Sequence, residues 1–364
     1  MNVTMDSEQC YKSEERPGDG QFKAANMEER QKQALGLLKE IRVWSKTSND
    51  IVDQMENCRI LSKYGGEPRC MLVTGHTGAG KSELIAKYRK DHQHYEKLNS
   101  SVKPVIYSEL PTQLCERGLL INVIKTIGPE IEDFACMDNE DLIREIVRLV
   151  NLLGIEAFIL DEAQKFLEHE SRRLQYDATD CVKNLIIRTK RPFILFGMPW
   201  CLHAIEQNPQ LASRFLRRYH LKPFKIMEPN DRSIYCTFLD MLDEKFIEKA
   251  VFTEKSDLKS QDTALRLFAV SRGNLRVLRN TIDEAATYAI IKNAPRITYG
   301  DLSMACDSLF PDGNPFRVAD LNDVIVQELA KPSYWDPDTK RSESPVKDET
   351  FTNGLRLGEV LSAS

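Results

Sequence analysis

The sequence predicts an α/β domain in which helices cover both faces of a five-stranded parallel sheet, followed by a smaller all-helical domain. Three observations predict this fold. Short apolar runs alternate with helical patterns, a glycine-rich loop follows the first run, and the runs stop after residue 228. Strands that are apolar along their whole length are typical of a sheet buried on both faces. The five runs are residues 70–74, 104–107, 157–160, 193–196 and 219–221.

Helical periodicity fills the intervals between these runs. Residues 27–44 carry apolar side chains at helical spacing and predict one amphipathic helix that leads into the core. Two further helices precede Gly128 and Gly154, which are typical residues for ending a helix. Residues 231–310 show helical patterns only and predict the second domain.

The predicted domain boundaries follow from these patterns and from composition. Residues 1–26 are polar and predict a flexible tail, residues 27–228 a nucleotide-binding domain, and residues 229–311 a helical lid. Residues 312–364 predict a tail that binds partners, with residues 332–350 unstructured. The apolar residues 351–361 fit a short binding peptide or a frayed terminus equally well.

Composition limits the class of protein. The chain has 364 residues, of which 41% are hydrophobic and 29% charged, and its net charge is −5. It contains no apolar run near the roughly 20 residues that cross a bilayer, and its first residues do not resemble a secretory signal. Nine cysteines without a C-x-x-C pair indicate reduced thiols in a cytoplasm rather than zinc ligands. Binding to nucleic acid would need a local basic stripe.

The loop after the first run is the strongest chemical signal. Gly75-His-Thr-Gly-Ala-Gly-Lys-Ser82 matches the Walker A pattern between a strand and a helix. Its glycines let backbone N–H groups surround phosphates, and the helix N-terminus favours negative charge. Lys81 is expected to reach the β and γ phosphates of ATP, and Ser82 to ligate Mg²⁺. A glycine-rich turn is the alternative, which the flanking strand and helix disfavour. The expected nucleotide-binding residues here are Gly75, Thr77, Gly78, Ala79, Gly80, Lys81, Ser82 and Glu83.

A second motif supplies carboxylates. Ala157-Phe-Ile-Leu-Asp161-Glu162 is an apolar strand that ends in two acidic residues. Asp161 is expected to help hold Mg²⁺, and Glu162 to act as the general base that polarises the attacking water. A pair that caps a helix is the alternative. One further strand between the two motifs indicates the hydrolytic branch of phosphate-loop proteins rather than kinases or small GTPases.

Two arginines are candidates for contact with the nucleotide. Arg214 follows the fourth run, so we expect it at the edge of the domain, where it would meet the γ-phosphate held by a neighbouring subunit. Arg276 lies in the first turn of a helix in the second domain and could fold over the nucleotide. Each is otherwise an arginine on a solvated surface.

In its order of motifs the chain resembles an AAA+ ATPase, and more narrowly the TniB/TnsC group, which regulates DNA transposition. The resemblance covers about residues 30–310 and implies a phosphate-loop domain with a helical lid. It is carried by residues 75–82, 160–164, 192–199, 210–215 and 271–274.

The resemblance implies that ATP drives assembly of a homo-oligomer, a hexameric ring or a helical filament, on double-stranded DNA. This assembly would link a target-selector protein of the TniQ/TnsD type to the transposase, without a membrane partner. It also assigns roles residue by residue. Gly75, Gly80, Lys81 and Ser82 bind phosphate and Mg²⁺, Asp161 and Glu162 form the Walker B pair, Arg214 is the finger and Arg276 the lid sensor.

One departure from the AAA+ pattern concerns the tip of the fourth strand. AAA+ proteins usually place a polar residue there to orient water, whereas this chain reads Leu195-Phe-Gly-Met-Pro199. Slow hydrolysis that serves as a switch is therefore expected. Candidate DNA contacts, each with a solvated surface as its alternative, are Lys97, Lys103, Lys183, Arg188, Lys190 and Arg191.

Two other functions remain open. A signalling or scaffold AAA+ module would oligomerise with nucleotide and bind proteins but not DNA, and the net acidity favours it. A replication-origin loader would need a winged helix after the lid, for which the residues after Pro311 are too few.

Overall fold

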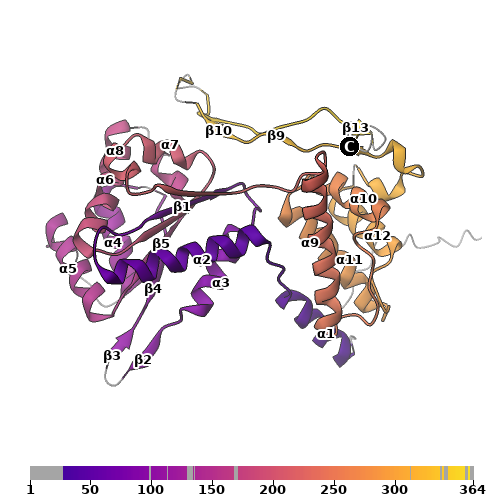
Figure 1. Ribbon diagram of the computed structural model, residues 1–364, viewed down its shortest axis with the longest axis horizontal. Coiled ribbons are helices and arrows are strands. Elements are labelled where there is room, and N and C mark those ends of the chain that lie inside the picture. Colours follow the sequence, from indigo (N-terminus) through magenta and orange to yellow (C-terminus); the bar gives the residue numbers. More distant parts are fainter. Residues whose placement is uncertain are drawn as a thin grey trace, which may run out of the picture.

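A parallel sheet of five strands lies at the centre of one domain (Figure 1). The computed structural model describes residues 28–97, 100–112, 114–128, 134, 136–167, 171–311, 313–336, 338–339, 343–356 and 360. The strands occur in the order β4-β5-β6-β1-β7. All five predicted strands are confirmed, and the glycine-rich loop follows the carboxyl end of β1. Their bounds are β1 Met71–Gly75, β4 Val105–Glu109, β5 Ala157–Asp161, β6 Phe193–Gly197 and β7 Arg217–Leu221.

Helices cover both faces of this sheet, which explains why the three inner strands β5, β6 and β1 are buried along their whole length, whereas the edge strands β4 and β7 carry polar side chains. Along β1, Leu72 packs into one core while Met71 and Val73 pack into the other, because successive side chains point to opposite faces. Helices α2 (Lys46–Leu61) and α3 (Lys81–Asp91) lie on the Met71 face. The other face carries α4 (Glu116–Ile127), α5 (Asn139–Leu152), α6 (Arg172–Thr189), α7 (Cys201–Glu206) and α8 (Pro209–Ala212).

The second domain contains helices α9 (Pro229–Glu248), α10 (Gln261–Ser271), α11 (Leu275–Ile291) and α12 (Tyr299–Leu309). The first helix, α1 (Glu29–Glu40), joins it, because Leu38 and Ile41 belong to the same hydrophobic core. The single helix expected over residues 27–44 is therefore wrong. Ile41 is extended, and Ser45 then caps α2 by accepting a hydrogen bond from the backbone nitrogen of Ser48 at 3.1 Å.

A C-terminal arm, residues 325–356, crosses from the helical domain over the sheet domain (Figure 1). Its strands pair antiparallel as β8 with β13, β9 with β12 and β10 with β11. Val326 belongs to the helical core, and Trp335 packs against the core of the sheet domain. The described part of residues 332–350 contains the paired strands β10 and β11 and the start of β12, so the expectation of an unstructured segment is wrong. The strands are β8 Ile325–Val326, β9 Leu329–Lys331, β10 Tyr334–Trp335, β11 Val346–Lys347, β12 Thr350–Phe351 and β13 Leu355–Arg356.

Several smaller elements complete the description. A hairpin of β2 (Tyr95–Lys97) and β3 (Ser100–Val102) projects between α3 and β4 (Figure 1). The short 3-10 helices are η2 Ser62–Tyr64, η3 Ala163–Phe166, η4 Pro315–Arg317 and η5 Leu321–Asp323. The predicted tail of residues 1–26 lies outside the described residues. No helix within the described residues has the length and apolar character needed to span a membrane.

Candidate nucleotide-binding site

The phosphate loop connects β1 to α3 and depends on glycine at several positions. Gly78 and Gly80 have φ angles of 81° and 94°, which side-chain-bearing residues rarely adopt. At Gly75 a Cβ atom would lie 3.0 Å from the Cβ of Leu221 on the neighbouring strand. The loop is closed by a hydrogen bond from the backbone nitrogen of Ala79 to the oxygen of His76, 3.1 Å long. These features produce a tight turn whose backbone can approach phosphate closely.

Lys81 lies at the first position of α3 and reaches back over the loop. Its Nζ atom donates to the backbone oxygens of Gly75 at 2.5 Å and His76 at 3.1 Å. Burial lowers the pKa of Lys81, and the carboxylates of Asp161 and Glu162 oppose that shift. A buried ammonium group in this position is suited to bind the negative charge of a phosphate.

The two carboxylates occupy the carboxyl end of β5, as predicted. Asp161 accepts a hydrogen bond from the backbone nitrogen of Glu162 at 2.8 Å and one from the Tyr107 hydroxyl at 3.4 Å. Burial raises the pKa of Asp161, and its hydrogen bonds and Lys81 oppose that rise. Glu162 has a φ angle of 61°, so it turns the chain sharply into η3.

A cavity of about 830 Å³ joins the loop and the carboxylates to the helical domain. Gly75 does not line this cavity, but its backbone oxygen accepts a hydrogen bond from Lys81, which does. The predicted residues that line it are Thr77, Gly78, Ala79, Gly80, Lys81, Ser82, Glu83, Asp161, Glu162 and Arg276.

The helical domain contacts the loop through the start of α11. The Asn274 amide donates to the backbone oxygen of Thr77 at 3.0 Å. The backbone nitrogen of Arg276 donates to the backbone oxygen of Gly78 at 3.1 Å. A Cβ on Gly78 would lie 2.6 Å from Asn274 Oδ1. Gly78 is therefore required both by its φ angle and by the close approach of the lid.

Other residues of the cavity were missed by the sequence analysis. Arg42, in the linker between α1 and α2, pairs with Glu83 at 2.6 Å, and Trp44 lies beside it on the cavity wall. From α11 come Arg279 and Asp283, whose side chains pair at 3.0 Å. They were missed because the linker was expected to be helical and because their contacts depend on how the domains pack.

Gln164 is the most informative of the missed residues. It is buried in η3 and also lines the cavity. Its amide nitrogen donates to the Glu162 carboxylate, and its amide oxygen accepts from the backbone nitrogen of Met198 at 3.0 Å. The motif Asp161-Glu-Ala-Gln164 contains it, but sequence alone did not reveal which way its side chain turns.

The residues present fit a magnesium–nucleotide complex. Ser82 and Asp161 bring a hydroxyl and a carboxylate to one cavity, and oxygen donors are the ligands that Mg²⁺ prefers. Lys81 and the turn at Gly78–Gly80 offer a cation and close backbone approach to phosphate.

Comparison with known proteins identifies the family. The model of the bacterial TniB protein matches residues 37–226, which is more than half of the chain. The chain belongs to the TniB family. No curated protein sequence matches it.

Two solved structures resemble this TniB-family protein in fold. The ORC2 protein of Aeropyrum pernix, described in ADPNP–ADP complexes, is 15% identical, with 75% of this chain and 70% of that chain covered and a TM-score of 0.51. CDC6P from Pyrobaculum aerophilum is 13% identical, with the same coverage and a TM-score of 0.53. The TniB-family protein therefore has the predicted AAA+ fold, a parallel five-stranded sheet between helices followed by C-terminal helices.

Arg214 lies apart from the cavity of the TniB-family protein. It precedes β7, where Arg217 pairs in register with Met71, at the opposite end of β1 from the phosphate loop. Its side chain is 16% exposed and pairs with Glu67. Arg214 therefore cannot reach the loop of its own chain in this arrangement.

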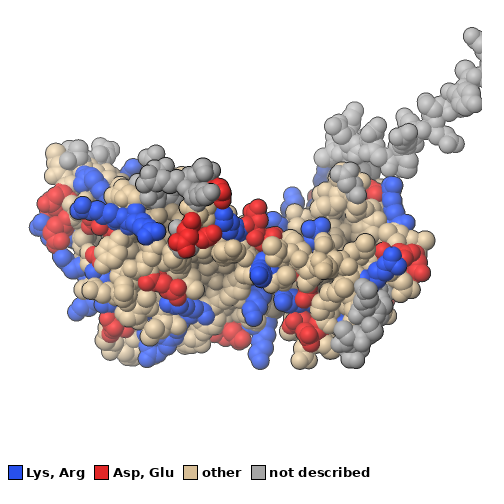
Figure 2. Space-filling view, turned by 90° about the horizontal axis from the view of Figure 1, so that it is seen from above, with Lys and Arg blue, Asp and Glu red and all other residues tan. Residues whose placement is uncertain are grey.

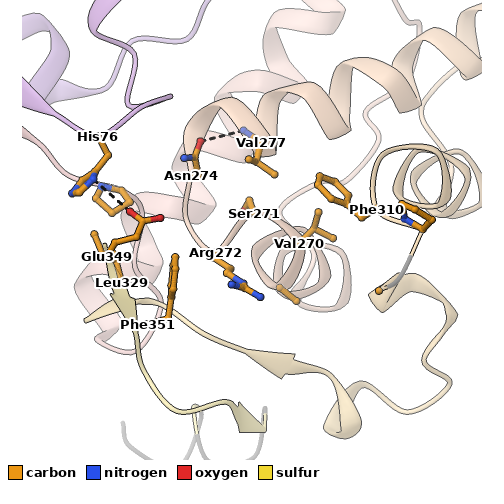
Figure 3. A pocket seen from close by; sticks show the side chains of 14 residues that line it. His76, Val270, Ser271, Arg272, Asn274, Val277, Phe310, Leu329, Glu349 and Phe351 are labelled. Atoms are coloured by element: carbon orange, nitrogen blue, oxygen red, sulfur yellow. Dashed lines mark hydrogen bonds and ion pairs between the residues drawn. The ribbon is translucent and has the colours of Figure 1, made fainter. Parts of the chain in front are cut away.

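The C-terminal arm of the TniB-family protein contacts the phosphate loop directly (Figure 3). Glu349 lies 3.4 Å from the Nδ1 atom of His76, and Ser333 is at the same distance from that atom. Burial and the charge of Lys81 lower the pKa of His76, which favours the neutral form of its imidazole. Phe351 lies under the Arg272 guanidinium, 5.1 Å from ring centre to Cζ, beside a cavity of about 520 Å³.

Three of the six predicted DNA-contacting side chains have partners within the chain. Lys183 pairs with Asp180, Arg188 pairs with Glu140 at 2.8 Å, and Lys103 donates to the backbone oxygen of Ile127 at 2.7 Å. The side chain of Lys97 lies outside the described residues. On the face shown in Figure 2, basic and acidic side chains are interspersed among the described residues.

Proposed function

We propose that this protein is an ATP-hydrolysing regulator of DNA transposition. It assembles with further copies of itself, as a ring or filament, on double-stranded DNA and links a TniQ/TnsD-like target selector to the transposase. The observation that carries the proposal is the single cavity that brings Lys81, Asp161, Glu162 and the lid residue Arg276 together in a TniB-family chain.

The chain's own residues have distinct tasks in ATP hydrolysis. The phosphate loop and Lys81 hold the β and γ phosphates, and Glu162 accepts a proton from the attacking water. Mg²⁺, held through Ser82 and Asp161, would neutralise charge on the phosphates. Arg276 would add a cation from the lid, and Arg214 would act on the nucleotide of a neighbouring subunit.

The lid contacts give a nucleotide-dependent switch a physical basis. Two hydrogen bonds connect the phosphate loop to α11, at Asn274 and Arg276. If the phosphate loop holds ATP and ADP in different ways, exchange of one for the other would change the position of the lid. The surface that the lid offers to the next subunit would change with it. Slow hydrolysis would keep the assembled state long enough for a transposase to engage it.

We place the contact with the DNA backbone in a groove of about 480 Å³ beside the β2–β3 hairpin. Arg89 and Lys90 are exposed at this groove, and Lys103 also lines it. The Arg89 guanidinium lies 4.7 Å from the Tyr107 ring centre, and the Tyr107 hydroxyl contacts Asp161. A phosphate bound by Arg89 would thus be linked through one tyrosine to the catalytic carboxylates.

An electrophoretic shift on random-sequence duplex DNA tests the proposal, with ADP, ATP and a non-hydrolysable ATP analogue compared. We expect binding with ATP or the analogue, equal on unrelated duplexes. Affinity should fall as salt rises, with a log–log slope of about −0.9 per phosphate neutralised. A strong preference for one sequence, or binding that ignores the nucleotide, would contradict it.

The alternative, an AAA+ scaffold that does not bind DNA, is favoured by two observations. The net charge is −5, and Lys183 and Arg188 are engaged in ion pairs within the chain. The same experiment separates the two functions. A scaffold would assemble with ATP in sedimentation but would leave every duplex unshifted, and exchanging Arg89 and Lys90 for alanine would have no effect on assembly.

A further inference from the structure

We propose that Gln164 is a positioning residue for hydrolysis, which fixes the Glu162 carboxylate and replaces the polar side chain absent from the tip of β6. The inference rests on the proposed ATP hydrolysis. It gives a role in that reaction to an uncharged residue that follows the carboxylates Asp161 and Glu162.

The orientation of the Gln164 amide follows from its two partners. The backbone nitrogen of Met198 can only donate, so the atom 3.0 Å from it must be the amide oxygen of Gln164. The amide nitrogen then faces Glu162 Oε2 and donates to it. A glutamine at this position satisfies both neighbours, whereas a carboxylate of the same shape would place two acceptors together.

The space around Gly197 shows why the polar group comes from η3. A Cβ at Gly197 would lie 3.1 Å from the amide oxygen of Gln164 and 2.9 Å from the sulfur of Cys201. Gly197 therefore has no room for a side chain while Cys201, Ala163 and Gln164 keep their positions. The polar group that faces Glu162 comes from η3 instead.

The same glutamine connects Glu162 to the segment that covers Lys81. Met198, whose backbone Gln164 holds, has its sulfur 3.8 Å from Lys81 Nζ. Gln164 is also at least nine-tenths buried, so its hydrogen bonds face little competition from water. It can thus fix the distance between the general base and the phosphate-binding lysine.

A general base acts only from a defined position, because proton transfer needs hydrogen-bond geometry to the attacking water. Without the amide donor, the Glu162 side chain regains its rotational freedom. Binding of ATP does not require that geometry, since the phosphate loop and Lys81 make those contacts. Loss of Gln164 should therefore lower kcat and leave KM and nucleotide affinity close to the parent values.

The test compares the parent protein with Gln164→Ala, Gln164→Glu and Gln175→Ala in steady-state hydrolysis and in binding of a fluorescent ATP analogue. Gln175 is a matched control, because it is also a buried glutamine with a hydrogen bond, to the backbone oxygen of Leu167 at 3.1 Å, but lies off the cavity. Gln164→Ala should lower kcat by about 10- to 100-fold, part of the 10²–10⁴ that general-base catalysis provides. Gln175→Ala should keep the parent kcat.

A conservative variant separates positioning from mere structural support. Gln164→Glu keeps the size of the side chain but replaces the amide donor that faces Glu162 with an acceptor, so we expect it to fold, to bind the ATP analogue as the parent does and to lose kcat as Gln164→Ala does. A folded Gln164→Glu protein that keeps the parent kcat would overturn the inference even if Gln164→Ala fails to fold.

The remaining outcomes are also decisive. If the parent hydrolyses ATP and Gln164→Ala keeps its kcat, or loses nucleotide affinity in proportion, the inference fails while the proposed function stands. A parent that binds the ATP analogue yet never hydrolyses ATP, with or without DNA, would overturn both.

Discussion

The side-chain amide of Asn274 donates a hydrogen bond to the backbone oxygen of Thr77, 3.0 Å away, and so joins the helical domain to the phosphate loop. The same side chain caps α11, because its oxygen accepts from the backbone nitrogens of Arg276 at 3.0 Å and Val277 at 3.3 Å. One residue therefore determines both where α11 begins and where it rests on the loop. Together with the hydrogen bond from Arg276 to Gly78, this contact connects the loop to the lid.

Substitution of Gly78 should separate backbone strain from contact with the lid. Gly78→Ala places a methyl group 2.6 Å from Asn274 Oδ1, whereas Gly66→Ala meets nothing within 4 Å. The two glycines have similar φ angles, 81° and 87°, so the strain of an alanine is matched. We expect only Gly78→Ala to lose nucleotide affinity, by at least tenfold, in calorimetric titration. Equal losses in the two variants would show that lid contact is unimportant.

Removal of the loop lysine should abolish nucleotide-dependent assembly. Lys81→Ala takes away the mobile cation of the cradle, while Lys90→Ala removes an exposed lysine from the same helix, off the cavity. In sedimentation without DNA, Lys90→Ala should assemble with ATP as the parent does. Assembly of Lys81→Ala at the parent's ATP concentration would contradict the role given to this cradle.

Replacing the general base should trap the assembled state. Glu162→Gln keeps the size of the side chain and the cavity but cannot accept the proton of water, so bound ATP should persist. Glu109→Gln is the control, since Glu109 lies beside Asp161 at the end of the neighbouring strand and pairs with Lys165 at 2.8 Å. Sedimentation under ATP should show more assembly for Glu162→Gln alone. If it assembles no better than the parent, the switch model is wrong.

A mixing experiment tests whether Arg214 acts on a neighbour. Arg214→Ala keeps its own Glu162, and Glu162→Gln keeps its arginine, so an equal mixture should regain part of the hydrolysis that each variant lacks. Such a finger is typically worth about 10³–10⁵ in turnover. Exchange of Glu67 for Gln, which frees Arg214 from its partner, should leave turnover intact. A mixture that co-assembles but stays inactive would remove the finger assignment.

Stability should depend on pH through the buried His76 and the partly buried His220. Burial lowers the pKa of His76 and of His220 from 6.5, with Lys81 adding to both shifts and Lys222 to the second. Because the unfolded chain binds these protons more tightly, the contribution to stability is present above about pH 6.5 and is lost as the pH falls through the lower, folded values. Denaturant unfolding at pH 7.5 and 5.5 should show a smaller loss for His76→Gln than for the parent. An unchanged loss would mean that other groups dominate.

Local sequence patterns predicted the sheet and the phosphate loop. They did not predict contacts between segments that are distant in the sequence. Buried parallel strands are continuous apolar runs, so β1 and its neighbours could be located closely. Ile41 continues the apolar period of α1, and the break there arises because the chain leaves one core for another. The domain boundaries remain predictions, but α1 packs with the helices that follow the sheet.

The arm and the Gln164 arrangement escaped prediction for a different reason. Strands of two or three residues, such as Tyr334–Trp335, are too short to show an alternating pattern. Trp335 is held by the core of the sheet domain, far away in sequence. Similarly, no local pattern indicates that Gln164 turns toward Met198, because that contact joins the ends of two strands.

The arm also has a consequence for the order in which the chain is made. Synthesis completes the phosphate loop and the five-stranded sheet before Ser333 and Glu349, which contact His76, leave the ribosome. Since domains of a nascent chain fold as units from the N-terminus, ATP can meet a loop that the arm does not yet touch. The last described strands then reach a phosphate loop that has already formed, so a chain that ends before residue 325 would keep the contacts of Asn274 and Arg276 with the loop and lack those of Ser333 and Glu349.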